Sequence, residues 1–296
     1  MELRQVEYVV GVVEHGGFTR AATALHVTQP ALSEGIARLE AELGIALFHR
    51  VGRRAVVSAA GEAFLEPARQ LLRDRAVLTT SVAAVVGIEA GRLDLVALPT
   101  LAVEPLSPLV GEFRRAHPGV VVHIEQPEEA TAITTRVRNG RSELGLAELP
   151  VDDAGLVSEP LLVQELVVLL PPSSPLVGRR RLTLADLAAV PLVMTPPGTP
   201  MRRLIDGAFA DAGAAATLAV ETEHREALVA LVLAGAGASI LPAPLADTAR
   251  AAGAVAVALS PRLRRQVGLI RRRGPVSPAA QAFIDITRSH FGRDHR

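Results

Sequence analysis

The chain has 296 residues, 49% of them hydrophobic and 21% charged, which is enough for about two domains that each bury an apolar core. It contains no cysteine, and this excludes disulfide frameworks, thiolate metal sites and cysteine nucleophiles. All 31 basic residues are arginine, so lysine-based phosphate loops and Schiff bases are also excluded, and the formal net charge of zero points to no class of partner.

Two helices are predicted at the start of the chain, and the second of them is short. Apolar residues recur every 3.6 positions over residues 3–13, and Gly16 and Gly17 end that helix. Thr19 can cap a second helix over residues 20–25, whose alanines permit close packing.

A third helix is predicted to follow Thr28, which can cap it, with Pro30 in its first turn. It ends at Gly44, and its apolar stripe consists of Leu32, Ile36, Leu39 and Leu43. Two short helices joined tightly, the second opening with polar residues, are typical of a helix-turn-helix. Strands over residues 45–49 and 55–57, around a turn at 51–54, predict a wing after it.

Ser58 can cap a long helix that runs to about residue 86. Its apolar positions are spaced by four and three residues and form a heptad seam with one polar interruption: Phe64, Ala68, Leu71, Arg75, Leu78, Val82 and Val85. A helix roughly 40 Å long cannot bury such a stripe alone. We therefore expect Phe64, Ala68, Leu71, Leu78 and Val82 to pair with the same helix of a second chain.

From residue 87 onward, short apolar segments alternate with helical patterns, which predicts an α/β architecture with a mainly parallel sheet. The expected strands cover residues 93–98, 120–124, 144–147, 166–170, 191–194, 218–220, 239–241 and 267–270. The uncharged stretch 227–246 contains two glycines and two prolines, so it predicts a buried helix, a turn and a strand, not a membrane span.

The sequence resembles the LysR-type transcriptional regulators. The resemblance is nearly continuous in FTRAA at 18–22, LHVTQPALS at 25–33, LG at 43–44 and LFHR at 47–50. It continues more weakly through HP at 117–118, ELGL at 143–146, SPL at 174–176 and LAGAGASILP at 233–242, so it covers essentially the whole chain. The resemblance implies an α/β multidomain protein with a winged helix-turn-helix, a linker helix that dimerises, and a two-lobed effector domain like a periplasmic binding protein.

By this resemblance, residues 1–60 form the DNA-binding domain, 61–88 the linker helix and 89–296 the effector domain. Lobe I then covers about 89–163 and 268–296, and lobe II about 164–267. The family typically forms homotetramers, built from homodimers, that bind promoter DNA and respond to a small molecule between the lobes. We expect a cytoplasmic protein with no cofactor or metal, no membrane partner, and an effector of unknown identity.

The third helix is expected to enter the major groove with its first residues facing base edges. Gln29 can bond an adenine edge, and the Ser33 hydroxyl can reach a base or a phosphate. Further candidates for DNA contact are Arg20, Thr28, Pro30, Glu34, Arg38, Arg50, Arg53 and Arg54. Helix capping alone would explain Thr28, and a solvated turn would explain the two wing arginines.

Two features in which the sequence departs from this family weaken its electrostatic attraction to DNA. Relatives often carry basic residues at the positions of Glu34 and Ala37. Through residue 60 six arginines balance six glutamates, so we expect modest non-specific affinity and a dependence on oligomeric avidity. Glu34 either accepts a bond from cytosine or simply faces solvent.

Ligands of two-lobed α/β domains bind where strands end and helices begin. By resemblance, the loops containing Thr100 and Thr199 face each other, and the candidate effector contacts are Thr100, Leu101, Gln126, Glu148, Thr195, Thr199 and Met201. Alternatives for Thr199 and Met201 are a helix cap and core packing. The acidic Glu148 argues against a simple anionic effector, whereas helix N-termini favour one, and the choice stays open.

Six arginines between residues 262 and 273 are interpreted as a solvated edge around a returning strand. Two other classes of function compete with a regulator. A solute-binding protein would need export, and the N-terminus lacks the basic start and apolar core of a signal peptide. An α/β enzyme would need a catalytic constellation, and no nucleophile motif, paired metal-ligand histidines or glycine-rich cofactor fingerprint occurs. No catalytic residue is therefore assigned.

Overall fold

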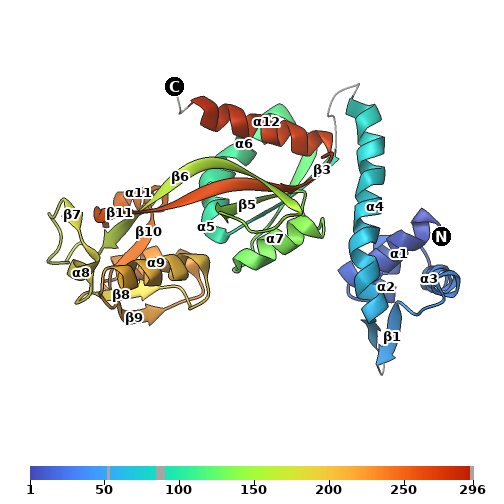
Figure 1. Cartoon of the computed structure of the whole chain (residues 1–296), viewed down its shortest axis with the longest axis horizontal. Helices are drawn as coiled ribbons and strands as arrows, with labels where there is room; N and C mark the ends of the chain where they lie inside the picture. Colours follow the sequence, from blue (N-terminus) through green and yellow to red (C-terminus); the bar gives the residue numbers. More distant parts are fainter. Residues whose placement is uncertain (52–53, 85–90, 294–296) are drawn as a thin grey trace. The chain divides into compact units, whose positions relative to one another are not determined.

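The computed structural model describes residues 1–51, 54–84 and 91–293 (Figure 1). Within these ranges it describes all side chains except those of residues 50, 51, 54, 73, 76, 77, 79–84, 226 and 293. The chain divides into two compact units, one mainly from Met1–Gly87 and the other mainly from the rest. No helix in the described part of the chain is long and apolar enough to cross a membrane.

The first unit is helical with a two-stranded wing. Its elements are α1 (Leu3–Glu14), α2 (Phe18–Ala24), α3 (Gln29–Leu43), β1 (Phe48–Val51), β2 (Arg54–Val57) and α4 (Ala59–Ala84). The antiparallel strands β1 and β2 pair Phe48 with Val57 and Val51 with Arg54. The predicted order of three helices, wing and long helix is confirmed.

Side-chain caps begin two of the helices in this unit, α3 and α4. The Thr28 hydroxyl accepts a hydrogen bond from the Ala31 amide at 3.4 Å, and the Ser58 hydroxyl accepts one from the Gly61 amide at 3.0 Å. The prediction that Thr19 caps α2 is wrong. The helix begins one residue earlier, at Phe18, and Gly17 occupies the cap position with φ 144°, a conformation that glycine adopts without strain.

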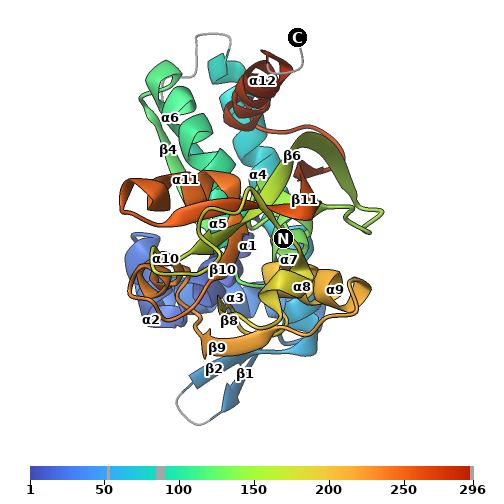
Figure 2. The same ribbon diagram turned by 90° about the vertical axis from the view of Figure 1, so that its left-hand side faces the viewer.

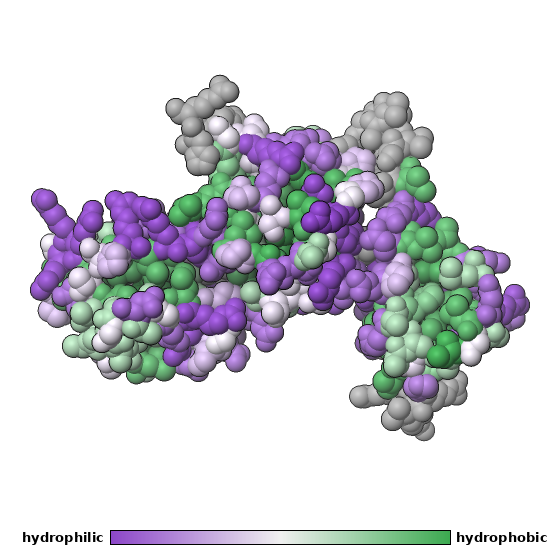
Figure 3. Space-filling view, in the orientation of Figure 1, coloured by the Kyte–Doolittle hydropathy of each residue, from purple (hydrophilic) through white to green (hydrophobic). Residues whose placement is uncertain are grey.

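Helix α4 divides its seam between two environments. The seam residue Ala68 is buried in the core of the first unit together with Leu65, which lies off the seam, and the seam residue Phe64 packs against that core. Further along, Leu71 is 40% exposed and Leu78 is 71% exposed. Figure 3 shows hydrophobic residues on the surface of this unit, including the region of α4. The side chains of Val82 and Val85 lie outside the described residues.

The second unit is built on a sheet in the order β10-β6-β11-β5-β3-β4, with β7 pairing β11. Its strands are β3 (Gly91–Ala97), β4 (Val120–Glu125), β5 (Leu144–Leu149), β6 (Leu156–Leu170), β7 (Arg181–Leu182), β10 (Ser239–Pro242) and β11 (Val255–Arg272). A separate parallel pair consists of β8 (Pro191–Met194) and β9 (Thr217–Glu221).

The expectation of a mainly parallel sheet is wrong. Strand β11 runs antiparallel to both β5 and β6, and β10 runs antiparallel to β6, whereas β3 is parallel to β4 and β5. The expected strands at 166–170 and 267–270 are parts of the long β6 and β11. Both strands continue through polar residues because they pair with each other over most of their length. The backbone N–H and C=O groups of each strand therefore bond to the other strand, whatever the side chains are.

Helices cover the strands on both sides. They are α5 (Pro99–Leu101), the π-helical segment η1 (Ala102–Leu106), α6 (Ser107–Ala116), α7 (Ala130–Arg138), α8 (Leu184–Leu187), α9 (Pro200–Asp211), α10 (Arg225–Leu233), α11 (Ala243–Ala251) and α12 (Pro278–Arg293). In lobe I, α6 and α12 lie side by side on one side of the sheet, and the ring centroids of Phe113 and Phe283 are 5.6 Å apart (Figure 1).

Lobe II has two hydrophobic clusters, one on each face of β6. Alternate residues of a strand point to opposite faces. Leu166 and Val168 therefore join one cluster with Phe209 of α9, whereas Val167 and Leu169 join the other, which includes residues of α10 and α11. In Figure 2, β8 and β9 lie beside α8 and α9 in this lobe. The two clusters therefore pack α9 against one face of β6 and α10 and α11 against the other.

Candidate functional site

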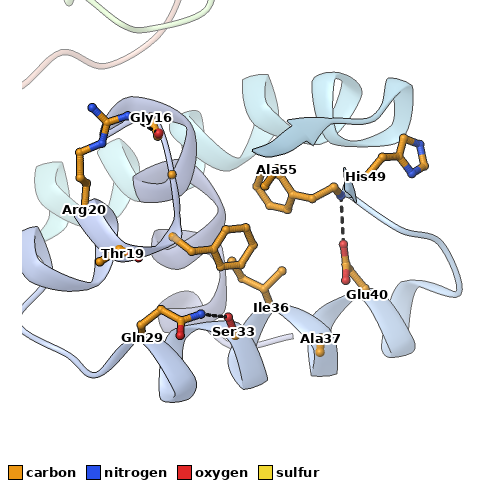
Figure 4. A pocket seen from close by; sticks show the side chains of 13 residues that line it. Gly16, Thr19, Arg20, Gln29, Ser33, Ile36, Ala37, Glu40, His49 and Ala55 are labelled. Atoms are coloured by element: carbon orange, nitrogen blue, oxygen red, sulfur yellow. Dashed lines mark hydrogen bonds between the residues drawn. The ribbon is translucent and has the colours of Figure 1, made fainter. Parts of the chain in front are cut away.

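A hollow in the first unit lies between the start of α2, helix α3 and the wing (Figure 4). Its lining residues are Gly16, Gly17, Phe18, Thr19, Arg20, Gln29, Ser33, Ile36, Ala37, Glu40, Phe48, His49 and Ala55. Three predicted DNA contacts, Arg20, Gln29 and Ser33, thus line one concave surface. His49 is exposed on the same surface.

Gln29 and Ser33 are held together by helix geometry. They are four residues apart on α3, so their side chains lie on the same face, and Gln29 Nε2 donates a hydrogen bond to Ser33 Oγ at 2.8 Å. Gln29 and Pro30 are exposed in the first turn, and Thr28 is exposed at the cap. This pair leaves the Gln29 amide oxygen and the Ser33 hydroxyl hydrogen to face a partner.

The charged candidates on the helices already have intramolecular partners. Arg38 forms an ion pair with Glu34 one turn earlier, and both side chains are more than half exposed. Arg20 Nη2 donates to the Gly16 carbonyl. Such exposed contacts are worth at most about 1 kcal/mol, so each can exchange for a phosphate or a base edge at little cost.

The wing candidates are only partly described. Arg50 lies in β1 and Arg54 begins β2, but their side chains are outside the described residues, as is the whole of Arg53. The wing is attached to α3 by Glu40, whose Oε1 accepts bonds from the Leu47 and Phe48 amides at 2.7 and 3.1 Å. Glu40 therefore positions β1 beside the hollow.

The second cluster of polar groups centres on Arg265 in β11. This residue is only 4% exposed. Its Nε donates to Gln164 Oε1 at 2.8 Å, and its Nη2 donates to Gln164 Oε1 and, at 3.0 Å, to Thr100 Oγ1. The predicted effector contact Thr100 is thus tied to an arginine for which the sequence predicts a solvated position. That prediction is wrong for Arg265.

Strand register explains why these groups meet. Arg265 is paired with Gln164 on β6, and Val267 is paired with Glu148 on β5. Paired residues of antiparallel strands share a face, as do residues two apart on one strand, so Gln164, Arg265 and Glu148 all project from the same face of the sheet.

Burial dominates the electrostatics of this face. Burial raises the pKa of Glu148, and the charges of Arg265 and Arg203 only partly offset it. Burial also lowers the pKa of Arg265 to about 10, with Glu148 acting against this shift and Arg225 adding to it. Arg265 is still cationic at neutral pH. Among the described residues no carboxylate forms an ion pair with it, and Glu148 Oε2 is buried without a hydrogen-bond partner.

The loop after β8 supplies the threonines. The Thr195 and Thr199 hydroxyls are 2.8 Å apart and both side chains are buried. Thr199 also caps α9 by accepting from the Arg202 amide at 3.3 Å, which is the structural alternative considered for it. Arg203 follows in the same helix and is the charge that reaches Glu148.

The remaining effector candidates are less favourably placed. Met201 and Leu101 are buried among apolar side chains, Met201 within the hydrophobic cluster of lobe II that contains Phe209. Gln126, beyond β4, is exposed. The described residues contain no group of three or more His, Asp or Glu side chains that could hold a metal ion.

Sequence reasoning missed Arg265 and Gln164, although a signal for Arg265 was present. Along residues 262–269, Leu263, Arg265, Val267 and Leu269 alternate with Arg262, Arg264, Gln266 and Gly268. A period of two places Arg265 on the apolar face of a strand. The arginine-rich composition of the segment hid this alternation.

Two family models match the chain. The one described as Bacterial regulatory helix-turn-helix protein, lysR family, matches residues 3–62, and the one described as LysR substrate binding domain matches residues 87–292. Together they account for both of the units in which the two polar clusters lie.

Relatives agree with both models over nearly the whole chain. The SDS degradation transcriptional activation protein of Pseudomonas sp. (strain ATCC 19151) is 36% identical over 291 residues, covering 95% of this chain and 94% of that protein. A full-length OxyR variant from Pseudomonas aeruginosa has the same fold, with a TM-score of 0.81 at 24% identity over 97% and 95% of the two chains. Full-length CbnR complexed with its target DNA gives a TM-score of 0.67 at 27% identity over 98% and 99%.

These matches set aside the solute-binding and enzyme alternatives. The chain belongs to the LysR family of bacterial transcriptional regulators, with an N-terminal helix-turn-helix and a C-terminal two-lobed α/β effector domain.

Proposed function

We propose that this regulator recognises promoter DNA by inserting the start of α3 into the major groove. The observation that carries the proposal is the concave surface where Gln29 and Ser33 of α3 lie beside Arg20 and His49. An α-helix fits the major groove, and an amide side chain can bond an adenine edge there. The solved relative CbnR was crystallised with its target DNA, which supports DNA binding by this chain.

The protein acts as a homodimer through α4 and assembles further into a homotetramer. The exposed Leu71 and Leu78 support this, because a helix leaves such residues in water only at a cost. Two or more linked DNA-binding units compensate for the lack of net positive charge in residues 1–60. In this proposal residues 61–88 are the linker, residues 89–296 bind the effector, and the DNA target places the protein in the cytoplasm.

The effector acts by binding one arrangement of the effector domain more tightly than another, which changes DNA affinity or bending by that difference. Of the contacts predicted from the sequence, Thr100, Glu148, Thr195 and Thr199 are retained, and Arg265 and Gln164 are added to them. The chain contains no cysteine, so a thiol-based response to oxidants is excluded.

The experiment is fluorescence anisotropy of the full chain with a labelled duplex from the intergenic region upstream of its own gene. A scrambled duplex is the control, and salt concentration is varied. We expect salt-dependent binding with at least a tenfold preference for the upstream duplex. Equal binding to both duplexes, or none at low salt, contradicts the proposal for this region.

A further inference from the structure

The two charged groups of the effector domain each keep hydrogen-bonding capacity that the protein does not use. Arg265 is buried on β11 and Glu148 lies half-buried on β5, on the same face of the sheet. Buried polar atoms are normally satisfied, so the buried Oε2 of Glu148, which has no partner, requires an explanation.

A guanidinium has five N–H donors, and this one uses only part of them. Nε and Nη2 of Arg265 donate to Gln164 and Thr100. In the described part of the chain no group accepts a hydrogen bond from Nη1. The two N–H groups of Nη1 therefore remain for an acceptor that the protein does not supply.

Glu148, in contrast, lacks a hydrogen-bond donor. Its Oε2 is buried and accepts no hydrogen bond within the described residues. The hydrogen bonds of Arg265 go to Gln164 and Thr100 and not to Glu148, so the two charges attract each other without direct contact, and burial outweighs this attraction in both pKa shifts. Uncompensated charge in a poorly hydrated place is costly, so a molecule that supplies both missing partners gains binding energy from each.

The surrounding charge favours an anion at the arginine end. Arg203, in the first turn of α9, also acts on Glu148, and the N-terminus of this 12-residue helix carries a partial positive charge. Two cationic groups, Arg265 and Arg203, therefore act on the single carboxylate of Glu148. A plain anion nevertheless leaves Glu148 Oε2 without a donor.

We propose that the effector is a small carboxylate that also carries a hydrogen-bond donor, a hydroxy acid or an amino acid. Its carboxylate accepts from Nη1 of Arg265, and its hydroxyl or ammonium group donates to Oε2 of Glu148. This inference rests on the proposed function, because it names the chemistry of the molecule to which the regulator responds. Such a ligand suits both Glu148, which needs a donor, and the N-terminus of α9, which favours an anion.

The test is thermal stabilisation and calorimetric titration of the full chain, without DNA, by matched compounds on three skeletons. The plain acids are propionate, phenylacetate and succinate; the hydroxy acids are lactate, mandelate and malate; the amino acids are alanine, phenylglycine and aspartate. Primary amides of the hydroxy acids test the need for the carboxylate. We expect at least one skeleton on which a donor-bearing acid binds about ten times more tightly than its plain acid and than its amide.

Variants of Glu148 test whether this residue causes the preference for a donor-bearing acid. Glu148→Leu removes the acceptor and should reduce the tenfold preference to about one. Glu148→Gln keeps an acceptor oxygen without charge, so it should weaken the amino acid more than the hydroxy acid. The exposed Glu129→Gln is the matched control and should retain the preference.

Three results overturn the inference: no stabilisation by any member of the panel, equal binding of a plain and a donor-bearing acid on every skeleton, or an unchanged preference in Glu148→Leu. Because DNA is absent from this measurement, its outcome is separate from that of the upstream-duplex experiment. Ligand binding without promoter binding contradicts only the regulatory proposal for that region.

Discussion

Single side chains in this protein are positioned by the period of the element that carries them. On α3, Gln29 and Ser33 lie one turn apart and bond to each other, while Leu32, Ile36 and Leu39 point into the core. On β11 the period is two, and it places Arg265 on the same face as the buried Val267 and away from solvent. The same rule therefore exposes the groups proposed to face DNA and buries the group proposed to bind the effector.

The first prediction concerns base recognition. The double variant Gln29→Ala with Ser33→Ala should lose its preference for the specific duplex and retain binding to any duplex, because the arginines proposed to contact phosphates are unchanged. Gln29 is exposed and Ser33 half-buried, so the melting temperature should change little. Anisotropy and thermal denaturation measure the two effects. An unchanged preference would falsify the assignment of α3 as the recognition helix.

The second prediction concerns Glu148 and pH. A carboxyl whose pKa is raised by folding lowers the free energy of unfolding as pH rises through that pKa, because the folded state holds the proton more firmly than the unfolded state. Glu148→Gln removes this penalty. The variant should melt at a higher temperature than the parent at about pH 8, and the difference should shrink toward about pH 4. Melting temperatures of the parent and the variant, measured across this pH range, test the prediction. A variant that melts below the parent at about pH 8 contradicts it.

At the scale of elements, local signals identify helices more fully than strands. Caps and apolar stripes predict α1, α3 and the start of α4 closely, because both signals are local. Strands β6 and β11 are predicted only as short apolar segments, since their polar stretches carry no local strand signal. Helix α4 shows a further limit: periodicity identifies its apolar seam but not which part packs on its own unit.

The third prediction follows from the exposed end of that seam. Leu78→Asp should shift the protein toward monomer and weaken binding to the upstream duplex at least tenfold, because a charge replaces an apolar contact between helices. The exposed Ala63→Asp, which lies off the seam, is the control. Light scattering gives the mass. An unchanged mass for Leu78→Asp contradicts the role of α4 in dimerisation.

At the scale of the whole molecule, charge balance constrains how DNA is bound. The chain has 31 basic and 31 acidic residues, so long-range attraction to DNA is weak and phosphate contacts must come from a few placed arginines. Affinity then depends on linking several such units, which is the physical reason for oligomerisation in the proposed function.

The fourth prediction measures these contacts. Arg20→Gln should reduce the slope of log affinity against log salt by about two for a complex with two bound protomers, because one phosphate contact is lost from each. Preference for the upstream duplex should persist. Arg180→Gln, an exposed arginine of the second unit, is the control and should leave the slope unchanged. An unaltered slope for Arg20→Gln contradicts its role at a phosphate.

The sequence by itself determined the family, the order of its two domains and the capped starts of α3 and α4, because these depend on contiguous motifs and local periods. Only the tertiary structure decided the direction of the strands and the composition of the polar cluster around Arg265. Arg265, Gln164 and Thr100 are up to 165 residues apart, and they meet through strand register. Pairing between distant strands is set by the whole fold, which no local pattern encodes.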